Sequence, residues 1–288
     1  YDLDIEPYKV RAVGMWLAVE ENLRASHSFR GSHTHHSFMA SHGMNRAMTA
    51  VETKFLNSMS RDLTHLASRG GLAPSLGHTK EIEEVFTIFV GGSRGVILVG
   101  NTGVGKESLV EEMASRMAAD LVPEILQDKR LLSLSIAGIL AGGSAAGSAE
   151  RLYRALSEAA HSGNVVLFIK DIHSLVGVGL QGEAGAETMG VDQVLSQALE
   201  NGQFFVVGTT DYKSYARHIE RSPLSQAMTR VEIPEPNAED AVLMLEARVP
   251  FIEAKHSVFF TYQSLEKAVV LTNKFIHTSH QPEKAHNI

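Results

Sequence analysis

The 288-residue sequence contains no cysteine, which excludes disulfide bonds and thiolate metal sites. It also lacks any apolar run long enough to cross a membrane as a helix, and it shows no signal-peptide pattern. A surplus of basic residues is missing too, because 33 acidic residues face 26 basic ones and the formal net charge is −7. We therefore expect no membrane span within this chain and no broad surface for nucleic acid.

The remaining composition is that of an ordinary soluble globular protein, with 44% hydrophobic and 20% charged residues. The length suits one large domain with attachments, or two domains. The absence of cysteine is compatible with a reducing interior, and we expect a cytoplasmic location. Because the chain begins at Tyr1 without Met, we interpret it as a piece of a longer protein, whose other segments could bring it to a membrane.

The first part of the chain divides into a helical segment, a polar segment and a second helical segment. Apolar spacing predicts a helix over residues 8–25, and the pattern of residues 44–69 also looks helical. The polar segment between them is rich in histidine and predicts a loop or linker. A metal site there is the alternative, but no carboxylate is interleaved and the spacing matches no standard site. The histidines concerned are His27, His33, His35, His36 and His42.

From Lys80 onward, predicted helices alternate with short apolar strands. The strands are expected at residues 95–100, 130–136, 164–172 and 203–210, and residues 229–236 could hold a fifth. Helices are expected between them, and from Asn237 onward the pattern is only helical. Alternating units of this kind predict an α/β fold with a parallel sheet and helices on both faces. The helical end predicts a small second domain.

The strand at 95–100 leads into a glycine-rich loop that opens a helix. Residues 100–106 follow the pattern G-x-x-x-x-G-K, in which backbone N–H groups bind phosphate oxygens and the lysine reaches the outer phosphates. ATP or ADP is therefore the expected cofactor, and a glycine-rich turn that binds no nucleotide is the alternative. The candidate nucleotide-binding residues are Gly100, Asn101, Thr102, Gly103, Val104, Gly105, Lys106, Glu107 and Ser108.

Two positions do not suit the magnesium ion that usually accompanies a bound nucleotide. The residue after Lys106 is normally Ser or Thr, whose hydroxyl binds the metal, but here it is Glu107. A neighbouring strand should end in acids that hold the metal and orient the attacking water, but the strand at 164–172 provides Lys170 and Asp171. The ammonium of Lys170 repels a metal cation. Magnesium binding is therefore doubtful, and Asp171 is a weak candidate for the catalytic base.

Several stretches together resemble the first ATPase domain of Clp-type AAA+ unfoldases. They are "RDLTHLASRGGLAPSLGHTKEIEEVF" (61–86), "VGNTGVGKESLVEEMASRM" (99–117), "VPEILQDKRLLSLSIAGILAG" (122–142), "GNVVLFIKDIHSLVGVG" (163–179) and "VGTTDYKSYARHIE" (207–220). Residues 237–260 and "QPEKA" (281–285) resemble the start of that family's small helical lid. The order and the spacing of these motifs match as well.

The resemblance implies an AAA+ P-loop NTPase fold with a truncated lid. It divides the chain into an extension and linker (1–54), a large nucleotide-binding domain (55–236) and a lid (237–288). It also implies an oligomer, namely a ring of identical or different subunits, with protein partners. In the family's terms, Thr210 or, alternatively, Thr209 matches the polar residue called sensor 1.

The family's other functional positions are altered in this sequence. Where the family has Lys-Thr at the end of the glycine-rich loop, this sequence has Lys106-Glu107. Where the family has Asp-Glu at the end of the neighbouring strand, this sequence has Lys170-Asp171. Gln226 and Ala227 occupy the positions of the arginine pair that acts on a neighbouring subunit, and Arg230, a few residues further on, is a poor substitute. Ala145 stands for the aromatic residue of the pore loop that grips a substrate chain.

Three functions remain open from the sequence. The favoured one is a nucleotide-binding, hydrolysis-deficient Clp-like subunit, which serves as a scaffold or regulator in a chaperone or unfoldase assembly. The alternatives are an active unfoldase that uses Asp171 as the base, and a structural module that binds no nucleotide. The favoured interpretation predicts that Glu107 and Lys170 pair in a partly buried cleft where the metal would lie. The alternative is that each side chain turns to solvent.

Overall fold

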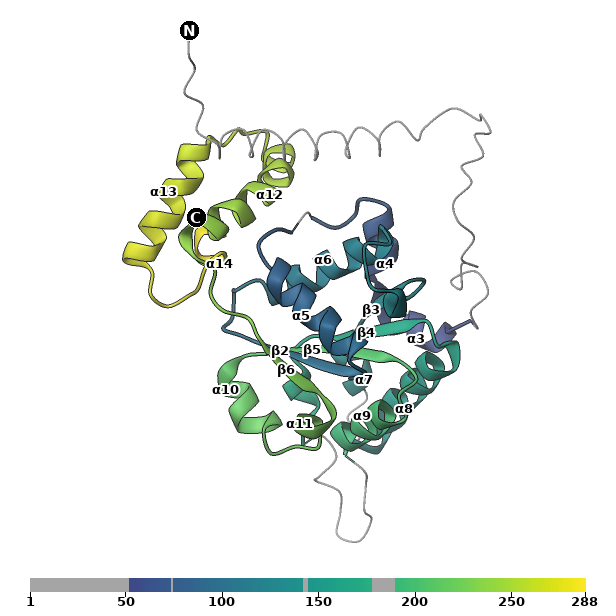
Figure 1. Cartoon of the computed structure of the whole chain (residues 1–288). Helices are drawn as coiled ribbons and strands as arrows, with labels where there is room; N and C mark the ends of the chain where they lie inside the picture. The colour runs from purple at the N-terminus through teal and green to yellow at the C-terminus, as the bar shows by residue number, and fades with distance from the viewer. Residues whose placement is uncertain (1–51, 74, 142–144, 178–189) are drawn as a thin grey trace, which may run out of the picture.

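The computed structural model describes residues 52–73, 75–141, 145–177 and 190–288. The predicted helix at 8–25, the histidine-rich linker and residues 142–144 of the matched pore loop lie outside these ranges. In Figure 1 a large domain is built around a sheet, and a smaller helical unit formed by the C-terminal residues lies beside it. No helix within the described ranges is both long and apolar enough to cross a membrane.

A six-stranded sheet organises the large domain in the order β1-β3-β4-β5-β2-β6. All neighbouring strands run parallel except β1, which is antiparallel to β3. The expected α/β fold with a parallel sheet is therefore confirmed, and every predicted strand is present. The strands are β1 (Ser60–Asp62), β2 (Gly95–Val99), β3 (Arg130–Leu134), β4 (Val165–Ile169), β5 (Phe205–Thr210) and β6 (Thr229–Glu232).

The predicted helix over 44–69 is wrong where the structure describes it. This stretch contains α3 (Lys54–Ser58), then β1, then α4 (Leu63–Ser68). The Asp62 carboxylate accepts a hydrogen bond of 2.8 Å from the His65 N–H, so Asp62 caps α4 and starts a new helix. Between the two helices, Ser60 to Asp62 pair with the edge of β3.

Helices cover both faces of the sheet, as Figure 1 shows. The predicted helices appear as α5 (Thr79–Val90), α6 (Lys106–Ala118), α8 (Ala145–Ser162) and α9 (Val191–Glu200). Shorter helical segments connect the elements, and none was predicted. They are η1 (Glu124–Leu126), α7 (Ile136–Leu140), η2 (Ile172–Leu175), α10 (Tyr212–Ser214), η3 (Tyr215–Ile219) and α11 (Leu224–Ala227).

The central strands are buried on both faces, which explains their continuous apolar sequence. In β2, Val96 and Leu98 point into one core, beneath α4, α5 and α6. Ile97 and Val99 point into the other, where α3, α8, α9 and α11 pack. Because β2 is held from both sides, the loop that follows Val99 starts from a fixed position.

The C-terminal helices form a smaller unit, which we call the lid. It consists of α12 (Ala238–His256), α13 (Tyr262–Phe275) and α14 (Glu283–His286), and it has a small apolar core of its own. Glu235, in the connection after β6, accepts hydrogen bonds from the Gln281 N–H at 2.8 Å and from Lys284 Nζ at 3.1 Å. The side chain of Lys284 is only 8% exposed. This ion pair ties α14 to the edge of the large domain.

Candidate functional site

The loop between β2 and α6 has the backbone of an anion cradle. Gly103 and Gly105 adopt φ angles of 88° and 97°, which disfavour any side chain. A Cβ atom at Gly100 would lie 2.5 Å from the Ile233 carbonyl oxygen of the neighbouring strand segment. Behind the loop, His78 Nε2 lies 3.0 Å from the Val104 carbonyl oxygen, and burial lowers the pKa of His78. The loop is therefore braced on two sides.

Lys106 begins α6 and folds back over the loop. Its ammonium donates hydrogen bonds to the carbonyl oxygens of Gly100 at 2.7 Å and Asn101 at 2.8 Å. Burial lowers the pKa of Lys106, while nearby carboxylates, led by Asp211 and Asp171, oppose that shift. The Lys106 ammonium group is therefore hydrogen-bonded to two backbone carbonyl oxygens, and a rotation of the side chain would bring it to a phosphate group.

Glu107 and Lys170 form the predicted ion pair. Lys170 Nζ lies 2.5 Å from Glu107 Oε1, and this hydrogen bond raises the pKa of Lys170. The pair joins the start of α6 to the residue that follows β4. The expectation of a partly buried cleft is wrong, since the Lys170 and Glu107 side chains are 53% and 56% exposed.

Asp171 and the two sensor 1 candidates lie at the ends of β4 and β5. Asp171 has a left-handed backbone with φ of 50°, and its N–H donates a hydrogen bond of 3.2 Å to Thr209 Oγ1. Thr209 and Asp171 both line the cavity beside the loop. Thr210 is fully buried, with its hydroxyl 3.0 Å from His173 Nδ1. Thr209 is almost as buried as Thr210, but of these two candidates only Thr209 lines the cavity.

The cavity beside the loop has a volume of about 480 Å³ and lies between the large domain and the lid. Thr102, Gly103, Gly105, Lys106, Glu107 and Ser108 line it on the loop side. Five acidic residues and three Lys or Arg residues surround it. They are Glu107, Glu111, Asp171, Asp211, Glu283, Lys106, Lys170 and Arg248.

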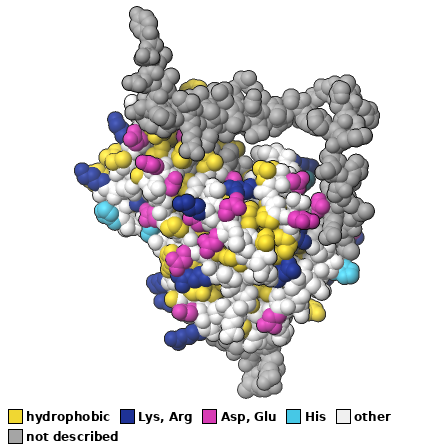
Figure 2. Space-filling model, viewed as in Figure 1, with side chains coloured by type: hydrophobic (Ala, Val, Ile, Leu, Met, Phe, Trp, Pro, Cys, Tyr) yellow, Lys and Arg dark blue, Asp and Glu magenta, His cyan; other side chains and the backbone are white. Residues whose placement is uncertain are grey.

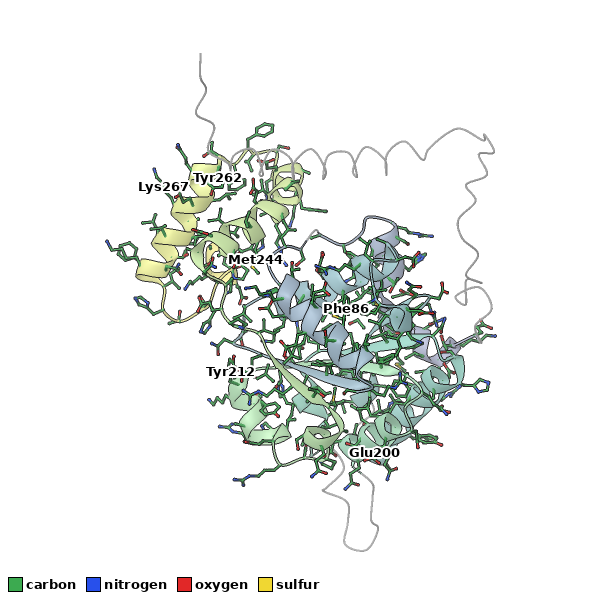
Figure 3. All side chains as sticks on the ribbon, viewed as in Figure 1. Phe86, Glu200, Tyr212, Met244, Tyr262 and Lys267 are labelled. Carbon is green, nitrogen blue, oxygen red and sulfur yellow. The ribbon has the colours of Figure 1, made fainter. Side chains whose placement is uncertain are left out.

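Sequence reasoning missed the lid residues of this cavity. Met244, Leu245 and Arg248 come from α12, and Glu283 and His286 come from α14. Figure 3 shows Met244 at the side of the lid that faces the large domain. The "QPEKA" stretch resembles a lid motif, but this resemblance does not indicate that α14 contacts the loop.

Glu283 lies directly on the glycine-rich loop. A Cβ atom at Gly103 would overlap the Glu283 carboxylate and would lie 2.8 Å from its Cβ. The Glu283 N–H also approaches the Gly103 carbonyl oxygen at 3.4 Å. The lid therefore places a negative charge next to the backbone that is expected to receive phosphate.

The residues at the expected arginine positions lie in α11, away from the cavity. Gln226 and Ala227 are both part of this short helix. Arg230, two residues into β6, forms an ion pair with Glu232, and its guanidinium lies 4.9 Å from the centre of the Tyr215 ring. Arg230 therefore already contacts two residues of its own domain. On the face shown in Figure 2, acidic and basic side chains are intermixed.

Both the large domain and the lid match known protein families. The family described as "ATPase family associated with various cellular activities (AAA)" matches residues 96–234, and the AAA lid domain matches residues 237–288.

Curated relatives cover most of this chain. The ATP-dependent Clp protease ATP-binding subunit ClpC of Staphylococcus aureus (strain USA300) is 34% identical over 243 residues, which is 83% of this chain and 29% of that protein. The negative regulator of genetic competence ClpC/MecB of Bacillus subtilis (strain 168) is 32% identical over 82% of this chain and 29% of its own length. The chain thus spans less than a third of these relatives.

Solved structures agree with the sequence comparisons. The extended Hsp104:casein complex of S. cerevisiae aligns with a TM-score of 0.72 and 30% identity, over 81% of this chain and 40% of that chain. The S. cerevisiae Hsp104-ADP complex aligns with a TM-score of 0.70 and 28% identity, over 81% of this chain and 32% of that chain.

Proposed function

Because the chain belongs to the AAA ATPase family and is homologous to Clp-type unfoldases over most of its length, we propose that it binds ATP or ADP without hydrolysing ATP efficiently. In this role it is a scaffold or regulatory subunit of a chaperone or unfoldase assembly. Protein partners, including an oligomer with itself or with active subunits, are part of the proposal.

The glycine-rich loop supports nucleotide binding. The N–H groups of the first turn of α6 have no acceptor within the helix, and Lys106 lies where it can reach a phosphate group. The cavity adds sufficient room beside the loop. The name of the Staphylococcus aureus relative includes ATP-binding, and one structural neighbour is an ADP complex.

The Glu107–Lys170 ion pair is the main evidence for the proposed loss of ATP hydrolysis. These two positions should supply the hydroxyl and the acid that hold magnesium. Instead, an ammonium group lies 2.5 Å from a carboxylate, so the two side chains neutralise each other at the place where the metal would lie. A magnesium ion does not fit beside this ammonium group. We infer that the pair takes the place of the metal.

The arginine positions support the same conclusion. An arginine supplied to a phosphoryl-transfer site can accelerate the reaction roughly a thousandfold or more. Gln226 and Ala227 cannot supply this charge, and Arg230 is engaged with Glu232. The location of Asp171 in the cavity favours the second candidate function, which is an active ATPase with Asp171 as the base.

Calorimetry with ADP, with and without magnesium, tests the proposal. We expect binding that Lys106→Ala weakens and that chelation of magnesium leaves nearly unchanged. The double variant Glu107→Thr/Lys170→Asp restores the residue types of a metal site, so its binding should become magnesium-dependent. The absence of any heat or melting shift with millimolar ADP would contradict nucleotide binding. Steady ATP turnover near one per second, abolished by Asp171→Asn, would favour the active ATPase.

A further inference from the structure

We propose that the predicted helix of residues 8–25 docks, within the same chain, onto an exposed apolar surface of the lid. We call this surface the lid tip, and it comprises the second half of α12 and the connection to α13. Its exposed apolar side chains are Phe251, Val258, Phe259, Phe260 and Tyr262. The inference goes beyond the proposed function, since it concerns a segment that lies outside both matched families.

The lid tip lacks the burial that stabilises most helices of folded proteins. From Arg248 to Ser264, a stretch that the structure describes throughout, no residue is buried. The first half of α12, in contrast, places Ala241, Val242 and Leu245 in the lid core. A helix in a protein gains most of its stability from packing of an apolar face. The second half of α12 therefore has an apolar side that another element is needed to cover.

The connection after α12 holds aromatic rings outward. Ser257 ends the helix with a left-handed backbone, and the Phe260 N–H donates a hydrogen bond of 2.7 Å to Glu253 Oε1. The Phe259 side chain is 94% exposed. Figure 3 shows Tyr262 on the side of the lid away from the large domain, which therefore does not cover this surface. An exposed apolar patch of this kind marks an interaction site.

The segment of residues 8–25, which lies outside the described ranges, has the composition of a helix that needs such a surface. Residues 12–19 contain no polar side chain, and a helix that is apolar around most of its circumference must be buried. Residues 26–51 connect the segment to the described chain and span about 85 Å when extended. A folded chain of this size is about 45 Å across. The segment can therefore reach the lid tip of its own chain.

Charged residues give the lid tip a negative and a positive end. Burial raises the pKa of Tyr262, and three nearby carboxylates add to this shift. They are Glu266, Glu246 and Glu239. Lys255 lies further along, in the last turn of α12. The negative charge is thus near the middle of α12 and the positive charge at its C-terminal end.

The segment has the complementary order of charges. Arg11 lies near its start, and Glu20 follows the apolar stretch. The spacing from Arg11 to Glu20 equals that from Glu246 to Lys255, which is about 14 Å along a helix. If the segment runs parallel to α12, each of its charges meets one of opposite sign. The apolar contacts supply most of the affinity, and the charges select this orientation.

The fluorescence of Trp16 tests the inference on the full chain. Trp16 is the single tryptophan of the sequence and lies within the segment. We expect its emission to be blue-shifted, and its quenching by acrylamide to be several-fold weaker than in the chain unfolded by urea. Phe259→Ser/Phe260→Ser should bring the quenching close to the unfolded value, since the loss of two phenyl rings lowers the docking equilibrium roughly a hundredfold.

Phe275→Ser is the matched control. Phe275 is also exposed, at 68%, but it lies at the other end of α13. Its substitution should leave the emission and the quenching of Trp16 unchanged. Melting curves verify that the variants are folded, and Phe259→Ser alone removes only a side chain that contributes little to the lid core.

Three results would overturn the inference. The first is a Trp16 that is as accessible in the folded chain as in urea. The second is protection of Trp16 that persists in Phe259→Ser/Phe260→Ser, because the segment would then dock elsewhere. The third is protection that disappears on dilution, which would place the segment on the lid tip of a second copy. These measurements use no nucleotide, so a failure of the proposed function would not change them.

Discussion

The Glu107–Lys170 pair should contribute measurably to stability in the absence of any metal. We consider the variants Glu107→Ala, Lys170→Ala and the double variant. Their free energies of unfolding form a double-mutant cycle, in which the coupling energy isolates the interaction between the two side chains. The cycle is needed because Lys170 also senses Asp171, so a single substitution changes more than one interaction.

The structure bounds the size of the coupling energy. At 2.5 Å, two unit charges attract each other by about 1.7 kcal/mol in the dielectric of water. More than half of each side chain is exposed, so solvent screening and the loss of side-chain freedom reduce this value. Exposed ion pairs typically show about 0.2–1 kcal/mol. We expect a value in the upper half of that range at low salt.

Urea denaturation at low and high salt measures the coupling energy. We expect it to fall toward zero near 1 M salt, where the screening length is about 3 Å. Millimolar magnesium should leave it unchanged, since the Lys170 ammonium group already neutralises the Glu107 carboxylate to which the metal would bind. A coupling energy within error of zero at low salt, or one that magnesium abolishes, would refute the idea that the pair replaces the metal.

Three further predictions concern the loop and the cavity. Gly103→Ala should destabilise the chain more than Gly92→Ala in urea denaturation, because both have positive φ but only Gly103 would collide with Glu283. Glu283→Gln should raise the affinity for ADP several-fold in calorimetry, because it removes a charge that repels phosphate; an unchanged affinity would contradict this. Burial raises the pKa of Glu111, so its charged form opposes folding at neutral pH. Glu111→Gln should therefore raise the free energy of unfolding at pH 7. This gain should shrink as the pH falls through the raised pKa of Glu111 and should vanish below the pKa that Glu111 has in the unfolded chain. A gain that persists below that pKa would contradict burial as its cause.

Local patterns predicted most of the large domain. The segment from Gly95 to Ala118 was predicted correctly because a buried strand, a glycine-rich loop and an amphipathic helix each leave their own signal in adjacent residues. The strand Ser60–Asp62 was missed because three residues carry no usable periodicity. It exists through pairing with Leu132–Leu134, about 70 residues away, and such pairing has no local signal.

The site was predictable only in part for a similar reason. The loop and the Glu107–Lys170 pair followed from motifs whose spacing was recognisable. Arg248 and Glu283 join the cavity because the lid folds back over the loop, and nothing near either residue in the sequence signals that contact. The sequence does not indicate that the ion pair is exposed either. Two positions that would hold the same metal ion can lie in an open or in a closed cavity.

The electrostatics of the cavity explain why the two altered positions make sense only together. Glu107 with an acid at position 170 would add repulsion to a cavity already lined by Asp171, Asp211 and Glu283, so phosphate would be repelled unless a metal intervened. Lys170 beside a threonine would be an unpaired ammonium group that excludes the metal. With both present, their charges cancel and leave Lys106 to meet the phosphates. We therefore propose that the pair preserves the charge conditions for binding while it removes the metal site that hydrolysis requires.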